Sequence, residues 1–163
     1  DMPIELFTHP EEFRYLILAL QRQGSRRLNR LFSEVGLTHS QAEVVEVLGV
    51  HGPISTKEVG QYLVCESGSP SRLLDALVRK GISVSAQSTE DKRLTLHALS
   101  PKGRELLTQI KEKKVEFESQ LAAELRAVSE AHGGSVIEEL VALVSDPELK
   151  GALQRRFPHL YHP

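Results

Sequence analysis

The chain of 163 residues has a single cysteine, Cys65. One cysteine cannot form an intrachain disulfide, which favours a reducing compartment. No apolar run approaches the roughly 18 residues that a membrane span needs. The N-terminus also lacks the basic segment followed by an apolar one that marks a signal peptide. These absences predict a cytoplasmic protein with no membrane partner.

Signatures of catalysis are missing as well. No paired carboxylates, no nucleophile beside a base and no glycine-rich phosphate loop stand out in the sequence. The pair His159 and His162 has the spacing of metal ligands, but no nearby cysteine or acidic cluster completes a metal site. We therefore expect neither an enzyme nor a bound metal or cofactor.

The chain also lacks an overall excess of positive charge, since its formal net charge is −2. That balance is unfavourable for a nucleic-acid binder, because phosphate contacts need Lys and Arg. Basic residues nevertheless outnumber acidic ones between positions 66 and 104, and the remainder of the chain is acidic. The basic residues of this segment are Arg72, Arg79, Lys80, Lys92, Arg93, Lys102 and Arg104.

Apolar residues make up 40% of the chain, enough for a core, and most of them recur at helical spacing. The pattern predicts a mainly α fold in which several helices surround one β-hairpin. Asp146-Pro147 is interpreted as the end of the last helix, and the tail through Pro163 is left unplaced. The expected helices span residues 10–35, 38–49, 55–63, 69–80, 101–131 and 136–144.

Local signals in the middle of the chain define a helix pair and a hairpin. Ser55-Thr56-Lys57-Glu58 has the pattern of a capping box. Ser69-Pro70 is typical of an N-cap followed by proline in the first helical position. Apolar and polar residues then alternate over 82–87 and 94–98, which indicates two strands joined by the polar stretch 88–93.

This order predicts a helix-turn-helix followed by a wing. The helices 55–63 and 69–80 are joined by a tight connection, as in a helix-turn-helix. A helix fits the major groove of DNA, and a basic hairpin tip beside it reaches phosphates or the minor groove. Small hydroxyl residues at the start of the second helix suit contacts to bases and phosphates.

In several of these segments the sequence resembles the MarR family of winged helix-turn-helix transcriptional regulators. The resemblance depends on the order and spacing of several segments. They are Gly36-Leu37-Thr38 with Gln41, Val59-Gly60-Gln61-Tyr62-Leu63, Leu77-Val78-Arg79-Lys80-Gly81, Glu90-Asp91-Lys92-Arg93 and Leu99-Ser100-Pro101-Lys102-Gly103.

The resemblance implies three regions and a function. Residues 1–36 and 101–163 would form dimerisation helices, and 37–100 the DNA-binding domain. A homodimer would bind a pseudo-palindromic operator in double-stranded DNA and act as a repressor released by a small-molecule effector. Arg93 would enter the minor groove or contact its backbone, oriented by Asp91. The expected DNA contacts are Lys57, Ser67, Ser69, Pro70, Ser71, Arg72, Lys92 and Arg93.

Other interpretations of these residues stay open. Arg93 is either a DNA contact or a solvated charge paired with Asp91, and the serines also suit a helix start for local reasons. The weak charge of the second helix would also fit a winged helix that binds proteins and not DNA. The basic run Arg22 to Arg30 is either a solvated face or a contact to flanking DNA, the opposite lobe or an anionic effector.

Cys65 has two interpretations, because it lies at the turn of the helix-turn-helix. Most lone cysteines are small buried hydrophobes. The alternative is a thiol-oxidation sensor, in which the neighbouring helix N-terminus lowers the pKa of the thiol. Glu66 opposes that effect because its negative charge disfavours a thiolate. A repressor released by oxidation of Cys65 is therefore the alternative to release by a small molecule.

Overall fold

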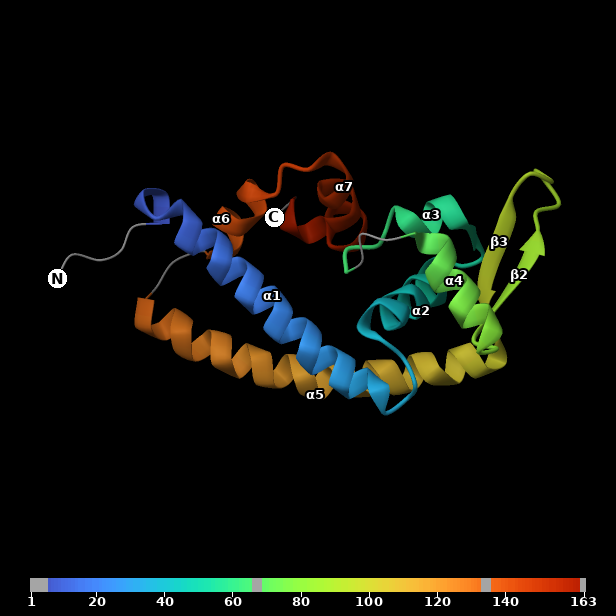
Figure 1. Ribbon diagram of the computed structural model, residues 1–163, viewed down its shortest axis with the longest axis horizontal. Helices are drawn as coiled ribbons and strands as arrows, with labels where there is room; N and C mark the ends of the chain where they lie inside the picture. The colour runs from blue at the N-terminus through green and yellow to red at the C-terminus, as the bar shows by residue number, and fades with distance from the viewer. Residues whose placement is uncertain (1–5, 66–68, 133–135, 162–163) are drawn as a thin grey trace. The chain divides into compact units, whose positions relative to one another are not determined.

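The computed structural model describes residues 6–65, 69–132 and 136–161, and its chain divides into two units, Asp1–His39 and Ser40–Pro163. Helices dominate both units, and the small sheet belongs to the second (Figure 1). The mainly α fold with a β-hairpin wing is confirmed. In the described ranges, no helix combines the length and the apolar character that crossing a membrane requires.

The first unit consists of a short 3-10 helix, η1 (Leu6–Thr8), and the long helix α1 (Pro10–Ser33). Pro10 occupies the first helical position, where its missing N–H costs nothing. Gly24 lies within α1 and does not interrupt it. After the helix, Gly36 adopts a φ of 74°, and the backbone N–H of Leu37 donates to the carbonyl of Phe32 at 3.0 Å. This left-handed residue ends α1.

The second unit holds the remaining helices and strands, which begin with the helix-turn-helix and the wing and end with helices that follow it. They are α2 (His39–His51), β1 (Ile54–Ser55), α3 (Thr56–Gly60), α4 (Pro70–Arg79), β2 (Ser83–Gln87), β3 (Thr95–Leu99), α5 (Pro101–His132), α6 (Val136–Leu143), α7 (Pro147–Arg156) and η2 (Pro158–Leu160).

The core of the second unit lies where α2, α3, α4 and the start of α5 meet. Leu74 and Leu77 of α4 are fully buried, and each contributes about 1.5–3 kcal/mol by leaving water. Because both leucines lie on one face of α4, the opposite face stays exposed. The other core residues are Ala42, Val44, Val45, Val47, Leu48, Ile54, Val59, Leu63, Ile82, Leu99, Ile110 and Ala152.

The sheet has three antiparallel strands in the order β1-β3-β2. The two wing strands were predicted, but the short β1 was not. In the wing, Val84 is 53% exposed whereas His97 is buried. The alternation therefore identified the strands but not the face that packs inward. At the base of the hairpin, where Ser83 pairs with Leu99, both residues are buried.

The C-terminal tail contains a helix that the sequence interpretation missed. Asp146-Pro147 was interpreted as the end of a helix, but it begins α7 instead. The Asp146 carboxylate accepts the backbone N–H groups of Glu148 and Leu149, both at 3.0 Å, and Pro147 takes the first helical position. This is the same N-cap and proline pattern that correctly predicted α4.

Candidate nucleic-acid interface

Helix α3 begins with the predicted capping box. The Ser55 hydroxyl accepts the backbone N–H of Glu58 at 3.2 Å, and the Glu58 carboxylate accepts the N–H of Ser55 at 3.3 Å. Val59 is completely buried, while Lys57 on the outer face is exposed. The helix ends at Gly60, where an added Cβ would lie 3.0 Å from the ring of Pro70. Glycine therefore allows α3 to pack closely against the start of α4.

The first turn of α4 presents small polar groups to solvent. Ser69 is the N-cap and Pro70 the first helical residue, as predicted. The hydroxyls of Ser69 and Ser71 lie 2.5 Å apart, and the N–H of Arg72 donates to the carbonyl of Ser69 at 3.1 Å. Ser69, Ser71 and Arg72 are exposed. Ser67, the other predicted contact here, lies outside the described residues.

The wing tip is held by side chains that bond to its own backbone. The hydroxyl of Ser88 accepts the N–H groups of Glu90 and Asp91 at 3.3 and 3.2 Å. The side-chain amide of Gln87 donates to the carbonyl of Lys92 at 2.6 Å. The tip is therefore an ordered turn that carries Lys92 at its outer end.

Asp91 and Arg93 form a two-point ion pair at this tip. The Nε and Nη2 groups of Arg93 donate to the two carboxylate oxygens of Asp91, each at 3.0 Å. The side-chain bond from Arg93, followed by its backbone N–H, lowers the pKa of Asp91, and the carboxylate raises the pKa of Arg93. The Arg93 side chain is still 90% exposed. Its direction is set by Asp91, while its outer edge is open to a partner.

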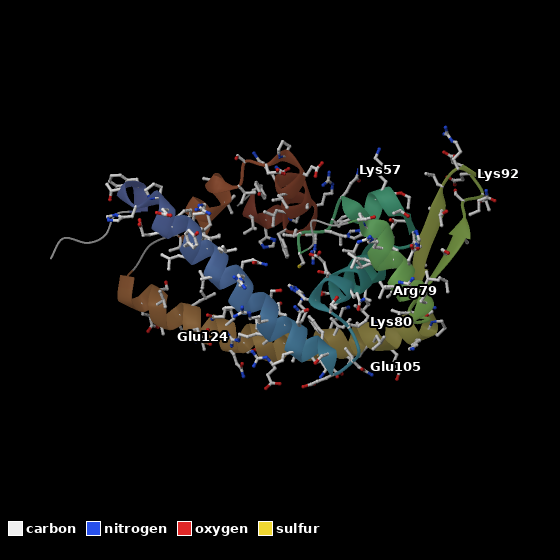
Figure 2. The ribbon with its side chains drawn as sticks, viewed as in Figure 1. Lys57, Arg79, Lys80, Lys92, Glu105 and Glu124 are labelled. Atoms are coloured by element: carbon white, nitrogen blue, oxygen red, sulfur yellow. The ribbon has the colours of Figure 1, made fainter. Side chains whose placement is uncertain are left out.

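These elements share one side of the second unit. Figure 2 shows Lys57 on α3 and Lys92 on the wing tip projecting away from α5, whereas Arg79 and Lys80 lie at the far end of α4, near α5. Lys80 Nζ donates to Gln41 Oε1 at 3.0 Å. The structure thus brings Lys57, the start of α4 and Lys92 at the wing tip to one face. Arg79 and Lys80 lie away from it.

Glu43 is a site residue that the sequence interpretation missed. It is 3% exposed in α2, and its carboxylate accepts the backbone N–H groups of Val64 and Cys65 at 3.1 Å. Arg156 of α7 donates to the same carboxylate at 2.6 Å. The signal in the sequence was a charged residue within the apolar run Ala42 to Val45. A helix face that packs on the core almost never carries a charge unless that charge is paired.

Cys65 is exposed as a residue, but its thiol faces Glu43. Sγ donates to Glu43 Oε2 at 3.2 Å. Partial burial, followed by the negative charge of Glu43 and this hydrogen bond, raises the pKa of Cys65 to about 12, against the opposing charge of Arg156. The expectation that the helix N-terminus lowers this pKa is therefore wrong, because burial and the Glu43 carboxylate oppose thiolate formation.

A groove of about 430 Å³ lies between α3 and α7. Its basic groups are Lys57 and Arg155, and its acidic group is Glu148. Gly60, Gln61 and Pro147 complete the lining. Among the residues that the structure describes, no group of three or more histidine, cysteine or acidic side chains is arranged to hold a metal ion.

Comparison with known proteins agrees with this architecture. Residues 37–103 match the family described as winged helix DNA-binding domain. The chain is 30% identical over 116 residues to the HTH-type transcriptional regulator YwoH of Bacillus subtilis, a match that covers 69% of this chain and 84% of YwoH. The crystal structure of a cysteine-to-serine mutant of Escherichia coli MarR superposes with a TM-score of 0.59 at 25% identity, covering 80% of this chain and 95% of that one.

The chain belongs to the MarR family of winged-helix transcriptional regulators. A second B. subtilis regulator, YkoM, is 34% identical over 77 residues, or 47% of this chain, and the match spans half of the length of YkoM. The matched winged-helix domain contains α3, α4 and the wing. The predicted family and fold are thus confirmed, whereas the individual DNA contacts and the three-region division stay predictions.

Proposed function

We propose that this MarR-family protein binds a pseudo-palindromic operator in double-stranded DNA as a homodimer and represses transcription there. The observation that carries the proposal is the shared face formed by Lys57, the start of α4 and Lys92 (Figure 2). Phosphate contacts from α3 and the wing would position the exposed first turn of α4 in the major groove. Arg93, directed by Asp91, would reach the minor groove beside it.

The proposed homodimer is supported by apolar surface outside the winged helix. On α5, Val115, Leu125 and Val128 are each at least 58% exposed, and on α6 Val136 and Ile137 are similarly exposed. Exposed apolar clusters of this kind commonly mark a protein interface. A two-fold dimer would place its two α4 helices about one DNA turn, roughly 34 Å, apart. Light scattering tests the dimer by comparing the molar mass of Leu125→Asp with that of the parent chain. The variant should be monomeric, because the aspartate would be buried at such an interface.

Release by a small molecule is supported by the groove between α3 and α7. Its volume of about 430 Å³ lies within the range of ligand sites. Lys57 and Arg155 favour an anionic occupant. Since Lys57 is also a proposed phosphate contact, a bound anion would compete with DNA for it. The raised pKa of Cys65 supports this mode of release over the thiol-oxidation alternative.

The central test is binding to the duplex upstream of the protein's own gene, measured by fluorescence anisotropy at several salt concentrations against a scrambled duplex. We expect tight, sequence-dependent binding with a steep salt dependence. Arg93→Ala should weaken binding and reduce the salt slope by about one, and Arg72→Ala should weaken it as well. Arg79→Ala is the matched control, because Arg79 is an exposed arginine at the far end of α4.

If the protein is instead a protein-interaction module, the anisotropy experiment gives a different result. The net charge of −2 favours this alternative over DNA binding. In that case, a folded protein would bind neither duplex at low salt, and Arg72→Ala and Arg93→Ala would behave like Arg79→Ala. This outcome would overturn the proposal.

A further inference from the structure

We propose that Arg156 is a positioning residue for DNA recognition, because its ion pair with Glu43 fixes the backbone that leads into α4. The inference rests on the proposed DNA-binding function and adds a role for the C-terminal helix α7. Arg156 and Glu43 are 113 positions apart in the sequence, and their contact joins the end of α7 to the middle of α2.

The first step is that Glu43 holds the turn after α3. One carboxylate oxygen accepts the N–H groups of both Val64 and Cys65 at 3.1 Å, and the other lies 3.2 Å from the N–H of Val64 and from the Cys65 thiol. These residues lie outside any helix or strand, so no backbone ladder supplies partners for their amides. The Glu43 side chain takes the place of such a ladder.

Second, Glu43 needs a counter-charge in order to hold this turn. Its side chain is 4% exposed, and a buried carboxylate without a positive partner is strongly destabilising. Arg156 Nη1 lies 2.6 Å from Glu43 Oε2, and the arginine side chain is itself 19% exposed. The guanidinium also lies over the ring of Phe157, 5.5 Å from its centre, which restricts its orientation.

The third step is that α7 is attached on both sides of the same turn. Arg155 Nη1 donates to the carbonyl of Gln61 at 2.8 Å, just beyond the end of α3, while Arg156 reaches Glu43 and through it Val64 and Cys65. Ala152, one turn earlier in α7, is 2% exposed and anchors the helix by packing. Helix α7 is therefore joined to the segment after α3 at Gln61 and, through Glu43, at Val64 and Cys65.

The consequence concerns the first turn of α4. Ser69 and Arg72 follow Cys65 by only a few residues, so their positions depend on how firmly residues 64 and 65 are held. A fixed turn lowers the ordering cost of binding and keeps base contacts in register. Loss of the Arg156 contact should therefore weaken binding and sequence discrimination. The salt dependence should not change, because Arg156 neutralises Glu43 and not a phosphate.

The test compares Arg156→Met with Lys150→Met, which removes an exposed cation from the same helix. Binding to the operator duplex and to a scrambled duplex is measured by anisotropy at several salt concentrations. Arg156→Met should bind the operator about tenfold more weakly and lose discrimination, with an unchanged salt slope. Arg156→Lys should retain most of the affinity, because it keeps the charge beside Glu43. Lys150→Met should resemble the parent.

Two further measurements separate positioning from a loss of folding. The double variant Glu43→Gln/Arg156→Met removes the unpaired buried charge but keeps a carbonyl oxygen that can accept the two amides, so it should recover thermal stability and part of the affinity. Hydrogen exchange at the amides of Val64 and Cys65 is measured without DNA. Exchange there should rise at least tenfold in Arg156→Met, while core amides such as that of Leu74 stay protected.

Several results would overturn the inference. One is unchanged exchange at residues 64 and 65 in folded Arg156→Met. Another is a loss of DNA binding in Arg156→Met that is fully explained by a smaller fraction of folded protein, while the preference for the operator over the scrambled duplex is unchanged. If the parent and Arg93→Ala bind DNA equally poorly, the proposed function itself fails. If Arg93→Ala weakens binding but Arg156→Met does not, only the positioning role fails.

Discussion

The side-chain hydroxyl of Ser100 donates a hydrogen bond to the carbonyl oxygen of Gly81 at 2.6 Å. Gly81, with a φ of 72°, follows the end of α4, and Ser100 precedes α5. The same hydroxyl accepts the N–H of Gly103 at 3.0 Å, in the first turn of α5. A Cβ at Gly103 would overlap the carbonyl oxygen of Ile82. The Ser100 hydroxyl also lies 3.0 Å from the carbonyl oxygen of Ile82, so this one buried hydroxyl joins the end of α4, the base of the wing and the start of α5.

The first prediction concerns a variant that lacks the Ser100 hydroxyl. Ser100→Ala should lower the free energy of unfolding by about 0.5–2 kcal/mol, because it deletes the side chain that accepts the N–H of Gly103 at the start of α5 and donates to the carbonyl of Gly81. Urea denaturation measures the change. Ser119→Ala is the matched control, since the Ser119 hydroxyl bonds to the carbonyl of Val115 on an exposed face of α5. Equal stability of the two variants would show that the Ser100 contacts contribute nothing.

The elements that the sequence predicted are those with signals in adjacent residues. Ser55 and Glu58 form their capping box across three positions, and Ser69-Pro70 begins α4, so these helix starts could be read directly. The strands of the wing were visible because alternation is also local. Strand β1 was missed, because two residues, Ile54 and Ser55, become a strand only through pairing with β3.

The rest of the site depends on contacts between distant segments. The charge of Glu43 within an apolar run was visible in the sequence, but its partner Arg156 was not, because α2 and α7 meet only in the folded chain. The pKa of Cys65 was misjudged for the same reason, since the neighbouring helix was visible in the sequence and the Glu43 carboxylate was not. Helix α7 was missed differently, because the Asp146-Pro147 signal was present but was interpreted as a stop.

The second prediction concerns pH and His97. Its Nε2 lies 2.9 Å from the Thr56 hydroxyl, and its buried Nδ1 has no hydrogen-bond partner among the described residues. Burial lowers the pKa of His97 from 6.5, opposed by the charge of Asp75. The unfolded chain then binds a proton at a higher pH than the folded one, so the contribution of His97 to stability is complete above pH 6.5 and is lost as the pH falls through the lower folded pKa.

Urea denaturation at a series of pH values between 5 and 8 checks this prediction. The free energy of unfolding of the parent should fall on acidification below about pH 6.5. In His97→Gln that part of the pH dependence should disappear, although the variant is less stable at neutral pH. Parallel curves for the two proteins would mean that another group causes the pH dependence.

The third prediction concerns the reactivity of Cys65. A pKa of about 12 leaves little thiolate at pH 8, and alkylation by iodoacetamide should be about 50-fold slower than for an unperturbed thiol, since the higher nucleophilicity offsets part of the loss. Glu43→Gln should speed the reaction by removing the negative charge beside the sulfur. The folded protein is compared with the urea-unfolded chain by mass spectrometry. Fast alkylation of folded parent protein would restore the thiol-oxidation alternative.

The fourth prediction separates two roles of Asp91 at the wing tip. If Asp91 acted only as a negative charge near phosphate, Asp91→Asn would strengthen DNA binding. Because its carboxylate directs Arg93 through two hydrogen bonds, we expect Asp91→Asn to weaken operator binding by about three- to tenfold. Glu90→Gln is the matched control, since it removes a neighbouring exposed charge and should strengthen binding slightly.

Anisotropy on the operator duplex distinguishes the two roles, and the double variant Asp91→Asn/Arg93→Ala completes the comparison. If Asp91 acts through Arg93, the double variant binds no more weakly than Arg93→Ala alone, because the group that Asp91 directs is already gone. Stronger binding by both Asp91→Asn and Glu90→Gln would show that charge repulsion outweighs orientation.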